Sequence, residues 1–206
     1  MAFPATISHQ QPCPRSNVNS IYSHNLAEHL ALFQSLHALD GIVAQAGQLA
    51  TATLQSGGKL LFCGNGGSAA DSQHLAAELT GRFIQDRRPL AALALSTDTS
   101  ALTCIANDYS FDEVFARQVQ GLGRAGDLLV AISTSGNSRN VIRAVEEAHS
   151  LDMKVLGLLG RDGGALKPMC DLAIVVPSPV TARIQEAHIL IGHTLCGMIE
   201  QELGLA

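Results

Sequence analysis

The amino-acid sequence predicts a doubly wound α/β fold, in which helices cover both faces of a parallel β-sheet. Short apolar runs alternate with longer segments whose apolar residues recur every three or four positions, as in amphipathic helices. Polar or glycine-rich turns follow several of these runs directly, which favours parallel strands joined by helices. The length of 206 residues suits one domain. The expected strands cover residues 60–63, 91–95, 128–132, 154–159 and 172–176.

The N-terminal part divides into a tail and a helical extension. Residues 1–20 contain several prolines among Gln, Ser and Asn, and this composition predicts a flexible tail. Residues 21–55 have helical spacing, and Gly41 is expected to divide them into two helices that cover the sheet or pack against a neighbouring subunit. We therefore expect residues 21–206 to form a single domain that includes these N-terminal helices.

The turn after the first expected strand, which we call the glycine turn, consists of residues 64–67 with the sequence Gly-Asn-Gly-Gly. Glycine permits positive φ angles and lets a ligand approach the backbone closely. Ser68 stands where a helix N-cap belongs, so the turn and the following helix N-terminus form an anion site. The pattern is neither a dinucleotide-binding motif nor a P-loop, and an ordinary tight turn is the competing interpretation.

Two potential metal ligands lie on the helix that follows the glycine turn. His74 and Glu78 are four residues apart, so they share one helix face at about 6 Å from each other. Such a pair alone is more often a solvated helix face than a site, and the spacing leaves both interpretations open.

The middle of the chain continues the alternation of strands and helices. The expected strand at 91–95 is followed by a potential helix cap within residues 96–99. A helix is expected over 101–105, and Asn107 and Asp108 are expected to interrupt it as polar turn residues. Helical spacing then resumes over residues 111–122.

The turn after the expected strand at 128–132 is rich in hydroxyl groups, and we call residues 133–138 the serine turn. Hydroxyl and backbone N–H groups at a helix N-terminus can donate several hydrogen bonds to a phosphate, although any single serine is also an ordinary helix cap. Ligands of doubly wound folds bind beyond the carboxyl ends of the strands. The glycine turn and the serine turn therefore predict one shared phosphate pocket.

The last expected helix, residues 181–203, carries several polar residues among apolar ones. Gln185 and His193 are eight positions apart, which places them roughly 80° apart around the helix axis and about 12 Å apart along it. They flank one face of the helix rather than stacking on it. The pattern alone gives no reason to prefer them over Glu186 or His188, and a histidine on a mostly apolar helix is more often part of the core.

Six motifs occur in order along the chain: Cys63-Gly-Asn-Gly-Gly-Ser68, His74-x-x-x-Glu78, Ala106-Asn-Asp108, Ser133-Thr-Ser-Gly-Asn-Ser138, Arg161-Asp-Gly-Gly164 and Ala182-Arg-Ile-Gln-Glu186. Together they closely resemble the motifs of the phosphoheptose isomerases, which are sugar isomerase (SIS) domain proteins. The resemblance runs from about residue 22 to residue 203. It implies a flavodoxin-like SIS fold and the conversion of sedoheptulose 7-phosphate to D-glycero-D-manno-heptose 7-phosphate.

The resemblance also implies a set of site residues. One zinc ion per subunit would be bound by His74, Glu78, Gln185 and His193. Some relatives carry an Asp where this chain has Ala182, so any supporting role of that carboxylate is missing here. A homotetramer with sites at subunit interfaces is implied, and the low content of charged residues, 15%, fits such an assembly. The implied substrate contacts are Asn65, Gly66, Gly67, Glu78, Asn107, Asp108, Ser133, Thr134, Ser135, Ser138 and Gln185.

The isomerisation moves a carbonyl group between C2 and C1 through a cis-enediol. It needs a base that removes a carbon-bound proton and an acid that protonates the carbonyl oxygen. Our hypothesis is that Glu78 is the base and His193 the acid, with a nearby metal that stabilises the enediolate oxygen. A carboxylate that holds zinc is less free to shuttle protons, so the sequence leaves open whether zinc is catalytic or structural.

The competing class has no catalytic activity. SIS proteins that bind the replication initiator DnaA share the fold, the Asn-Gly turn and the Ala-Arg-Ile-Gln-Glu segment. They tend to carry Ser and Asn at positions 78 and 193, and these residues cannot perform the acid–base chemistry. Glu78 and His193 therefore favour the isomerase. A third class, a phosphosugar-binding regulatory SIS module, would need only the serine turn.

Composition and charge argue against several other classes. The net charge of −5 and the absence of a basic stripe argue against nucleic-acid binding. No apolar run reaches about 18 residues, so no membrane span is expected, and the N-terminus lacks a secretory signal. Five widely spaced cysteines do not resemble a disulfide framework. We expect a cytoplasmic enzyme that acts on a sugar phosphate in the first step of ADP-heptose biosynthesis, whether for lipopolysaccharide, S-layer or other glycans.

Overall fold

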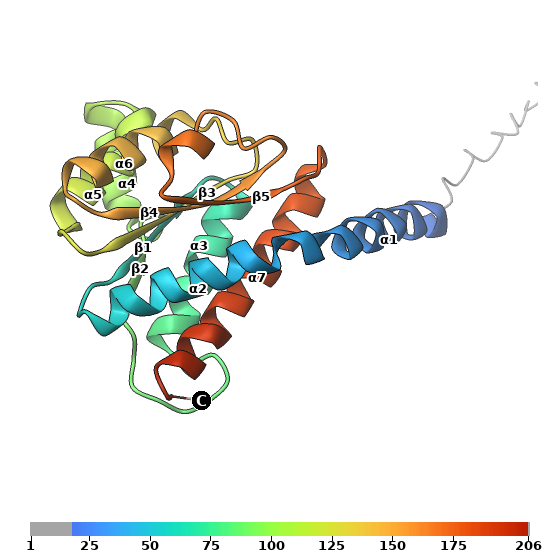
Figure 1. The fold of residues 1–206 in the computed structure, drawn as a ribbon. Helices are drawn as coiled ribbons and strands as arrows, with labels where there is room; N and C mark the ends of the chain where they lie inside the picture. Colours follow the sequence, from blue (N-terminus) through green and yellow to red (C-terminus); the bar gives the residue numbers. More distant parts are fainter. Residues whose placement is uncertain (1–17, 206) are drawn as a thin grey trace, which may run out of the picture.

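The computed structural model describes residues 18–205, and within them a five-stranded, fully parallel sheet forms the centre of the molecule (Figure 1). From β1 the chain adds β2 on one side and then β3, β4 and β5 on the other, in the order β2-β1-β3-β4-β5. This order puts the topological switch point, where such folds bind ligands, between β1 and β3. The strands are β1 (Leu60–Gly64), β2 (Ala92–Ala94), β3 (Leu128–Ser133), β4 (Lys154–Gly160) and β5 (Leu172–Val176).

Helices cover both faces of this sheet, which confirms the predicted doubly wound α/β fold (Figure 1). Strands that are covered on both sides are almost entirely apolar, as the fully buried β1 and β3 show. One face packs against α2 (Asp40–Gln55), α3 (Gly67–Thr80) and α7 (Thr181–Glu202). The other packs against α4 (Thr99–Asp108), α5 (Ala116–Leu122) and α6 (Arg139–Ser150).

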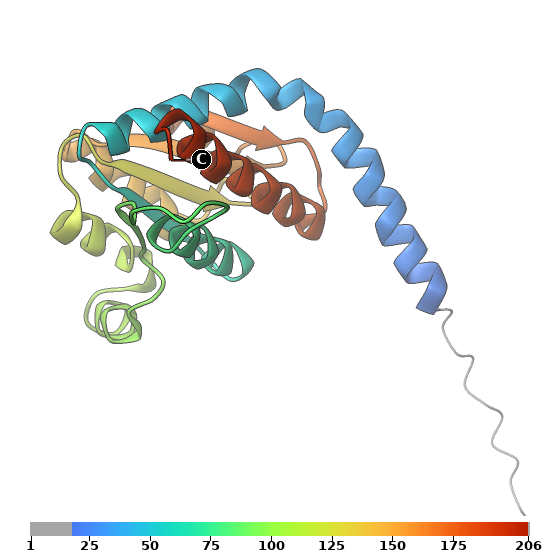
Figure 2. The same ribbon diagram turned by 90° about the horizontal axis from the view of Figure 1, so that it is seen from below.

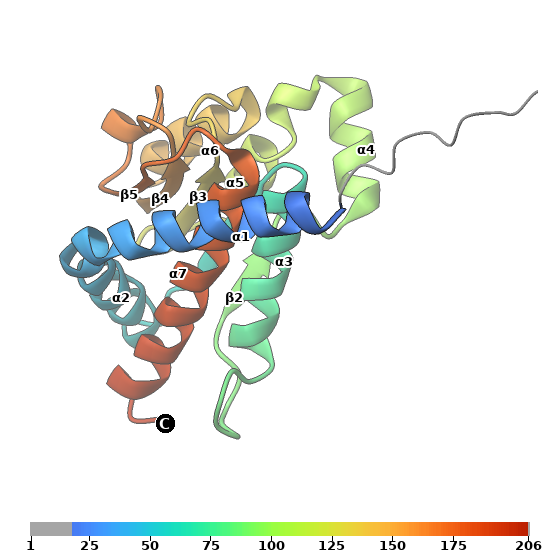
Figure 3. The same cartoon turned by 90° about the vertical axis from the view of Figure 1, so that its right-hand side faces the viewer.

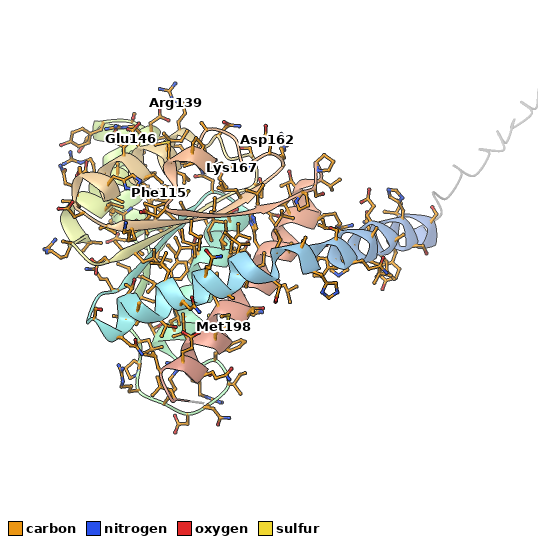
Figure 4. The ribbon with its side chains drawn as sticks, in the orientation of Figure 1. Phe115, Arg139, Glu146, Asp162, Lys167 and Met198 are labelled. Carbon is orange, nitrogen blue, oxygen red and sulfur yellow. The ribbon has the colours of Figure 1, made fainter. Side chains whose placement is uncertain are left out.

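The packing of α2 on α7 depends on one small residue. Figure 4 shows Met198 where α7 passes α2. A Cβ atom at Gly47 would lie 2.4 Å from Met198 Cε, so the glycine makes room for the methionine side chain. These two helices, together with α3, form the layer that carries the candidate site described below.

The N-terminal helix α1 (Val18–Ser35) projects from the body of the molecule (Figures 1 and 2). The expected division of the N-terminal helices at Gly41 is wrong, because a 3₁₀ turn over Leu36–Leu39 separates α1 from α2 and Gly41 lies in the first turn of α2. Residues 1–17 of the expected tail lie outside the described residues, and residues 18–20 belong to α1.

The segment around α4 also differs from expectation. Asp98 caps α4 as its segment suggested, since its side chain accepts a hydrogen bond from Ala101 N at 2.9 Å. Asn107 and Asp108 do not interrupt the helix but form its last turn, because the backbone hydrogen bonds continue to Tyr109 N. The expected helix over 111–122 is divided into a 3₁₀ turn, Phe111–Glu113, and α5.

A buried carboxylate fastens the residues that precede β1 and β3. Asp127 accepts hydrogen bonds from the backbone N–H groups of Lys59, at 2.9 Å, and Arg124, at 2.8 Å. It also forms an ion pair with the Lys59 ammonium group, and its side chain is only 4% exposed.

Among residues 18–205, none of the helices combines the length and the apolar character that a membrane span requires.

Candidate active site

Two helices with the same direction, α3 and α7, lie side by side (Figure 3). They bring three titratable side chains together. His74 and Glu78 lie on α3 at the predicted spacing of one helical turn, with His74 Nε2 2.9 Å from Glu78 Oε1. His193 comes from α7, and its Nε2 atom lies 3.2 Å from His74 Nε2. One ligand atom from each side chain lies within 4.8 Å of the others.

This cluster fits a divalent metal ion. Imidazole nitrogens and carboxylate oxygens are the ligands that zinc and related metals use. Ligand atoms about 2.0–2.1 Å from a tetrahedral ion lie roughly 3.3–3.4 Å apart, and the separations of 2.9 and 3.2 Å are close to this. Two imidazole nitrogens that face each other at 3.2 Å are also well placed to direct their lone pairs at one cation. The donor set can therefore hold a metal ion.

The alternatives that the spacing on α7 left open are separated by the structure. Glu186 has a structural role, since its carboxylate pairs with His29 of α1 at 2.8 Å and with Arg183. His188 is fully buried and its Nε2 atom donates to the carbonyl oxygen of Leu159 at 3.0 Å. Burial lowers the pKa of His188, which favours the neutral form of its ring. On α7, His193 is the histidine that faces α3.

Gln185 lies just over two turns before His193 on α7, and its side chain reaches the start of α3. A Cβ atom at Gly67 would lie 2.3 Å from Gln185 Nε2, so the amide occupies the space that any side chain at position 67 would need. Gly67 is the first residue of α3, where the backbone N–H groups lack partners within the helix. The structure therefore places the Gln185 amide against the glycine turn.

The glycine turn itself is built differently from the prediction. The expected N-cap at Ser68 is wrong, because Gly66 occupies that position with φ 57° and ψ −120°. Glycine adopts a positive φ without steric cost. Ser68 lies buried in the first turn of α3, where its carbonyl group accepts the hydroxyl of Ser72 at 2.8 Å.

A pair of amides joins the glycine turn to α6. Asn65 Nδ2 donates to Asn140 Oδ1 at 2.8 Å, and Asn140 Nδ2 donates to Asn65 Oδ1 at the same distance. Asn140 lies in the first turn of α6, directly after the serine turn, and is 2% exposed. The bridge therefore holds the two turns together at the ends of β1 and β3. It also uses the amide oxygen and one of the two amide N–H groups of Asn65, which was predicted to contact substrate.

The serine turn is fixed mainly by its own polar groups. The hydroxyls of Ser133 and Ser138 lie 3.0 Å apart, and the Asn137 amide donates to the carbonyl oxygen of Ser135 at 2.9 Å. Asn137 Oδ1 accepts a hydrogen bond from Ala165 N at 3.0 Å, which ties the turn to the loop after β4. Ser133 is buried, while Thr134, Ser135 and Ser138 are half-buried and border the switch point.

Asn107 and Asp108 lie on α4, on the face of the sheet opposite to α3 and α7 (Figure 1). Both side chains are exposed, and Asn107 Nδ2 donates to Asp108 Oδ1 at 2.8 Å. Hydrogen bonds from Asn107 and from the Cys104 thiol lower the pKa of the Asp108 carboxyl. The structure thus places these two predicted residues on a different layer from the cluster.

Sequence reasoning did not identify two residues that border the cluster. Asp71 lies one turn before His74 on α3, and its Oδ2 atom is buried without a hydrogen-bond partner among the described residues. Burial raises the pKa of the Asp71 carboxyl, although the charges of His74 and His193 oppose this. Phe83 stacks on the His193 ring with centroids 5.4 Å apart and planes at 24°. The spacing of three between Asp71 and His74 on one helix could have predicted that they are neighbours. No sequence pattern predicts the contact of Phe83 with His193.

Comparison with known proteins identifies the family. A family model described as SIS domain matches residues 22–160. A phosphoheptose isomerase from Helicobacter pylori (strain P12) is 57% identical over 176 residues, which cover 85% of this chain and 92% of that protein. A phosphoheptose isomerase from Rhodospirillum rubrum is 55% identical over 161 residues, which cover 78% of this chain and 86% of that protein.

Solved structures agree with these sequence matches. The phosphoheptose isomerase GmhA from Neisseria gonorrhoeae superimposes with a TM-score of 0.86 at 51% identity, covering 90% of this chain and all of that chain. A phosphoheptose isomerase from Francisella tularensis gives a TM-score of 0.86 at 42% identity, covering 90% of this chain and 99% of the other. On these matches and on the fold, the chain belongs to the phosphoheptose isomerase family of SIS domain proteins.

Proposed function

We propose that this chain converts sedoheptulose 7-phosphate to D-glycero-D-manno-heptose 7-phosphate, with the His74, Glu78 and His193 cluster as its catalytic centre. The observation that carries this proposal is the convergence of an acid–base pair, Glu78 and His193, between two helices of a phosphoheptose isomerase fold. Glu78 and His193 are also the residues that distinguish an isomerase from an initiator-binding SIS protein.

The reaction needs two proton transfers that these groups can perform. The Glu78 carboxylate removes a proton from C1 of the ketose, while the His193 imidazole protonates the carbonyl oxygen at C2, which gives a cis-enediol. The proton held by Glu78 then returns to C2, and His193 takes the proton from the C1 hydroxyl as the aldehyde forms. The contact between His74 Nε2 and Glu78 Oε1, at 2.9 Å, holds the carboxylate in place for both steps.

The metal of this site is proposed to be zinc, held by His74, Glu78, Gln185 and His193. The donor atoms of three of these residues already converge, and the Gln185 amide lies nearby against the first residue of α3. When bound, zinc would act as a Lewis acid on the oxygens of the reacting carbonyl group. Because an imidazole nitrogen binds a metal ion only in its neutral form, zinc loading is expected to weaken as the pH falls.

The phosphate group is proposed to bind in the shared pocket formed by the two turns. The glycine turn offers the N–H groups at the start of α3, and the serine turn offers hydroxyls and the N-terminus of α6. Hydroxyl and backbone donors suit a phosphate dianion without requiring a cation. The proposed contacts are Asn65, Gly66, Gly67, Ser133, Thr134, Ser135 and Ser138, with Glu78 and Gln185 toward the reacting carbons.

The assembly is proposed to be a homotetramer in the cytoplasm. The projecting helix α1 exposes large apolar side chains, among them Ile21 at 55%, Tyr22 at 68% and Leu30 at 54%. Apolar groups on a helix that extends beyond the body favour burial against another subunit. Asn107 and Asp108, exposed on α4, are then proposed to contact substrate at a subunit interface. The product is proposed to enter ADP-heptose synthesis for lipopolysaccharide or a related glycan.

The test is turnover of sedoheptulose 7-phosphate by the purified full chain, followed by NMR with added zinc or with a chelator. Glu78→Gln keeps the shape of the side chain but removes the base, so the rate should fall by about 10² to 10⁴ while the fold is kept. Glu146→Gln on α6, on the far side of the sheet in Figure 4, is the matched control and should retain the rate.

A Glu78→Gln variant with a near-normal rate would contradict the assignment of the base. If the folded, zinc-loaded wild-type protein shows no turnover at all, the initiator-binding class becomes the better description. A pull-down with DnaA would then decide between that class and a regulatory phosphosugar-binding module.

A further inference from the structure

A dense hydrogen-bond network lies beyond the C-terminal end of α3, outside the cluster. Its centre is a buried ion pair between Glu200 of α7 and Arg87, with Arg87 Nε 2.8 Å from Glu200 Oε1. The side chains are 1% and 2% exposed, respectively. A buried ion pair adds little net stability compared with apolar residues of the same volume, because both charges must leave water. The role of this ion pair therefore lies in the groups that it holds in place.

The Arg87 guanidinium caps the end of α3. It donates to the carbonyl oxygens of Leu79 at 2.8 Å and Gly81 at 3.1 Å, and it also reaches the carbonyl oxygen of Glu78 at 2.8 Å. The last carbonyl groups of a helix have no partners within it. Arg87 satisfies those of Glu78 and Leu79, and it thereby fixes the backbone of Glu78, the residue proposed as the base.

The Glu200 carboxylate holds the segment that follows α3. Its two oxygens accept the backbone N–H groups of Phe83 at 3.0 Å and Ile84 at 3.2 Å. The Phe83 ring then reaches back to His193, with the ring centroids 5.4 Å apart. It passes over Gly197, where a Cβ atom would lie 3.6 Å from Phe83 Cε1.

His193, Gly197 and Glu200 follow one another at spacings of four and three along α7, so they share one face of that helix. At one end of this face, the Glu200 carboxylate fixes the backbone of Phe83. At the other end, the ring of Phe83 lies on the imidazole of His193. Stacking of this kind restricts the orientation of the imidazole ring. The ion pair is thereby connected to both members of the acid–base pair.

We propose that Glu200 and Arg87 are positioning residues, which hold Phe83 against His193 and so fix the direction of the imidazole beside His74 and Glu78. The expected effect on kcat rests on the proposed function, whereas the expected effect on the orientation of His193 does not. Neither residue touches the reacting atoms, and both act through Phe83 and the backbone of Glu78.

The first test compares two buried carboxylates in the full-length protein. Glu200→Gln weakens the hold on Arg87 and on the backbone of Phe83. We expect kcat to fall roughly tenfold to a hundredfold, as a small misplacement of a reacting group does, while KM stays within about twofold. Asp127→Asn is the matched control, because Asp127 also accepts two backbone N–H groups and pairs with a cation. It should leave kcat unchanged.

The second test reads the orientation of His193 directly. In metal-free, ¹⁵N-labelled protein, the imidazole signals of His193, assigned with a His193→Gln variant, should shift in Glu200→Gln and in Phe83→Leu. They should stay in place in Asp127→Asn. Phe83→Tyr keeps a ring over the imidazole, so it should retain the wild-type signals and rate.

The outcomes separate this proposal from the proposed function. If the wild-type protein has no isomerase activity, the NMR shifts still support or overturn the positioning role. If Glu200→Gln does not fold, Phe83→Leu and Phe83→Tyr carry the same comparison without touching the ion pair. Unchanged His193 signals and unchanged kcat in a folded Glu200→Gln or Phe83→Leu variant would overturn the proposal.

Discussion

The glycine turn and the serine turn occupy equivalent places, at the ends of the neighbouring strands β1 and β3, but they keep space free for different reasons. At Gly67 a Cβ atom would meet the amide of Gln185, the far end of a flexible side chain, at 2.3 Å. At Gly136 a Cβ atom would meet the backbone carbonyl oxygen of Gly163 at 2.0 Å. The missing side chain at Gly67 makes room for Gln185 of the candidate site, whereas the missing side chain at Gly136 lets the serine turn pack against the loop after β4.

This difference means that the same substitution, Gly to Ala, is expected to damage the protein in two separable ways. A clash with backbone cannot be relieved without moving a loop, so it appears as lost stability. A clash with a side-chain amide is relieved by a change of rotamer, so it appears as lost function with the fold retained. Three sets of variants, in order of expected effect, test how far this contrast holds.

The largest effect is expected for Gly136→Ala in the serine turn. The residue has φ +67°, which an alanine rarely adopts, and it packs against the backbone of Gly163. The two costs together should lower the free energy of unfolding by roughly 3–5 kcal/mol. Urea denaturation at a fixed protein concentration, since assembly contributes to stability, would measure this. A loss below about 1 kcal/mol would show that the two loops can move apart and that the contrast is false.

A smaller but more specific effect is expected for Gly67→Ala in the glycine turn. The free energy of unfolding should change by less than about 1 kcal/mol, because position 67 begins a helix and alanine is a good helix former. Turnover should nevertheless fall roughly tenfold to a hundredfold as the Gln185 amide is displaced. Zinc content, measured after dialysis, should fall with it.

Gly41→Ala is the control for this variant. Gly41 also lies in the first turn of a helix, α2, and a Cβ atom there would have no neighbour within 4 Å. Stability and turnover should both be preserved or slightly improved. If Gly67→Ala behaves like Gly41→Ala in turnover and zinc content, then Gln185 has no role that depends on its place beside the turn.

The two turns also show what a sequence can and cannot predict. Each strand and its polar turn were evident, because apolar runs and turn residues are local signals, and β1 and β3 begin at the expected residues. The family and the enzyme class of sugar-phosphate isomerase are confirmed as well. Details set by backbone geometry were missed, such as Gly66 in place of Ser68 as the N-cap, or the 3₁₀ turn ahead of Gly41.

The candidate site shows the same limit over longer distances. His74 and Glu78 were paired from their spacing on one helix, and their contact at 2.9 Å confirms it. The approach of His193 from α7 depends on how two helices pack, and no periodicity within α7 reports that. Resemblance to a family supplied His193 and Gln185 instead. Phe83 and Glu200 carry no motif at all, and only the structure connects them to His193.

The smallest effect is expected where the two turns meet, at the reciprocal amide bridge between Asn65 and Asn140. Asn65→Ala and Asn140→Ala each leave one amide of the pair without its partner, so each should raise KM for the sugar phosphate severalfold. The double variant removes both amides. Its loss of apparent binding free energy for the sugar phosphate should therefore be smaller than the sum of the two single-variant losses by about 1 kcal/mol. Asn137→Ala is the control, because it loosens the serine turn and its contact with the loop after β4 but leaves the bridge intact, and its effect should add to that of Asn65→Ala. Strict additivity of Asn65→Ala with Asn140→Ala would mean that the turns hold their ligand independently.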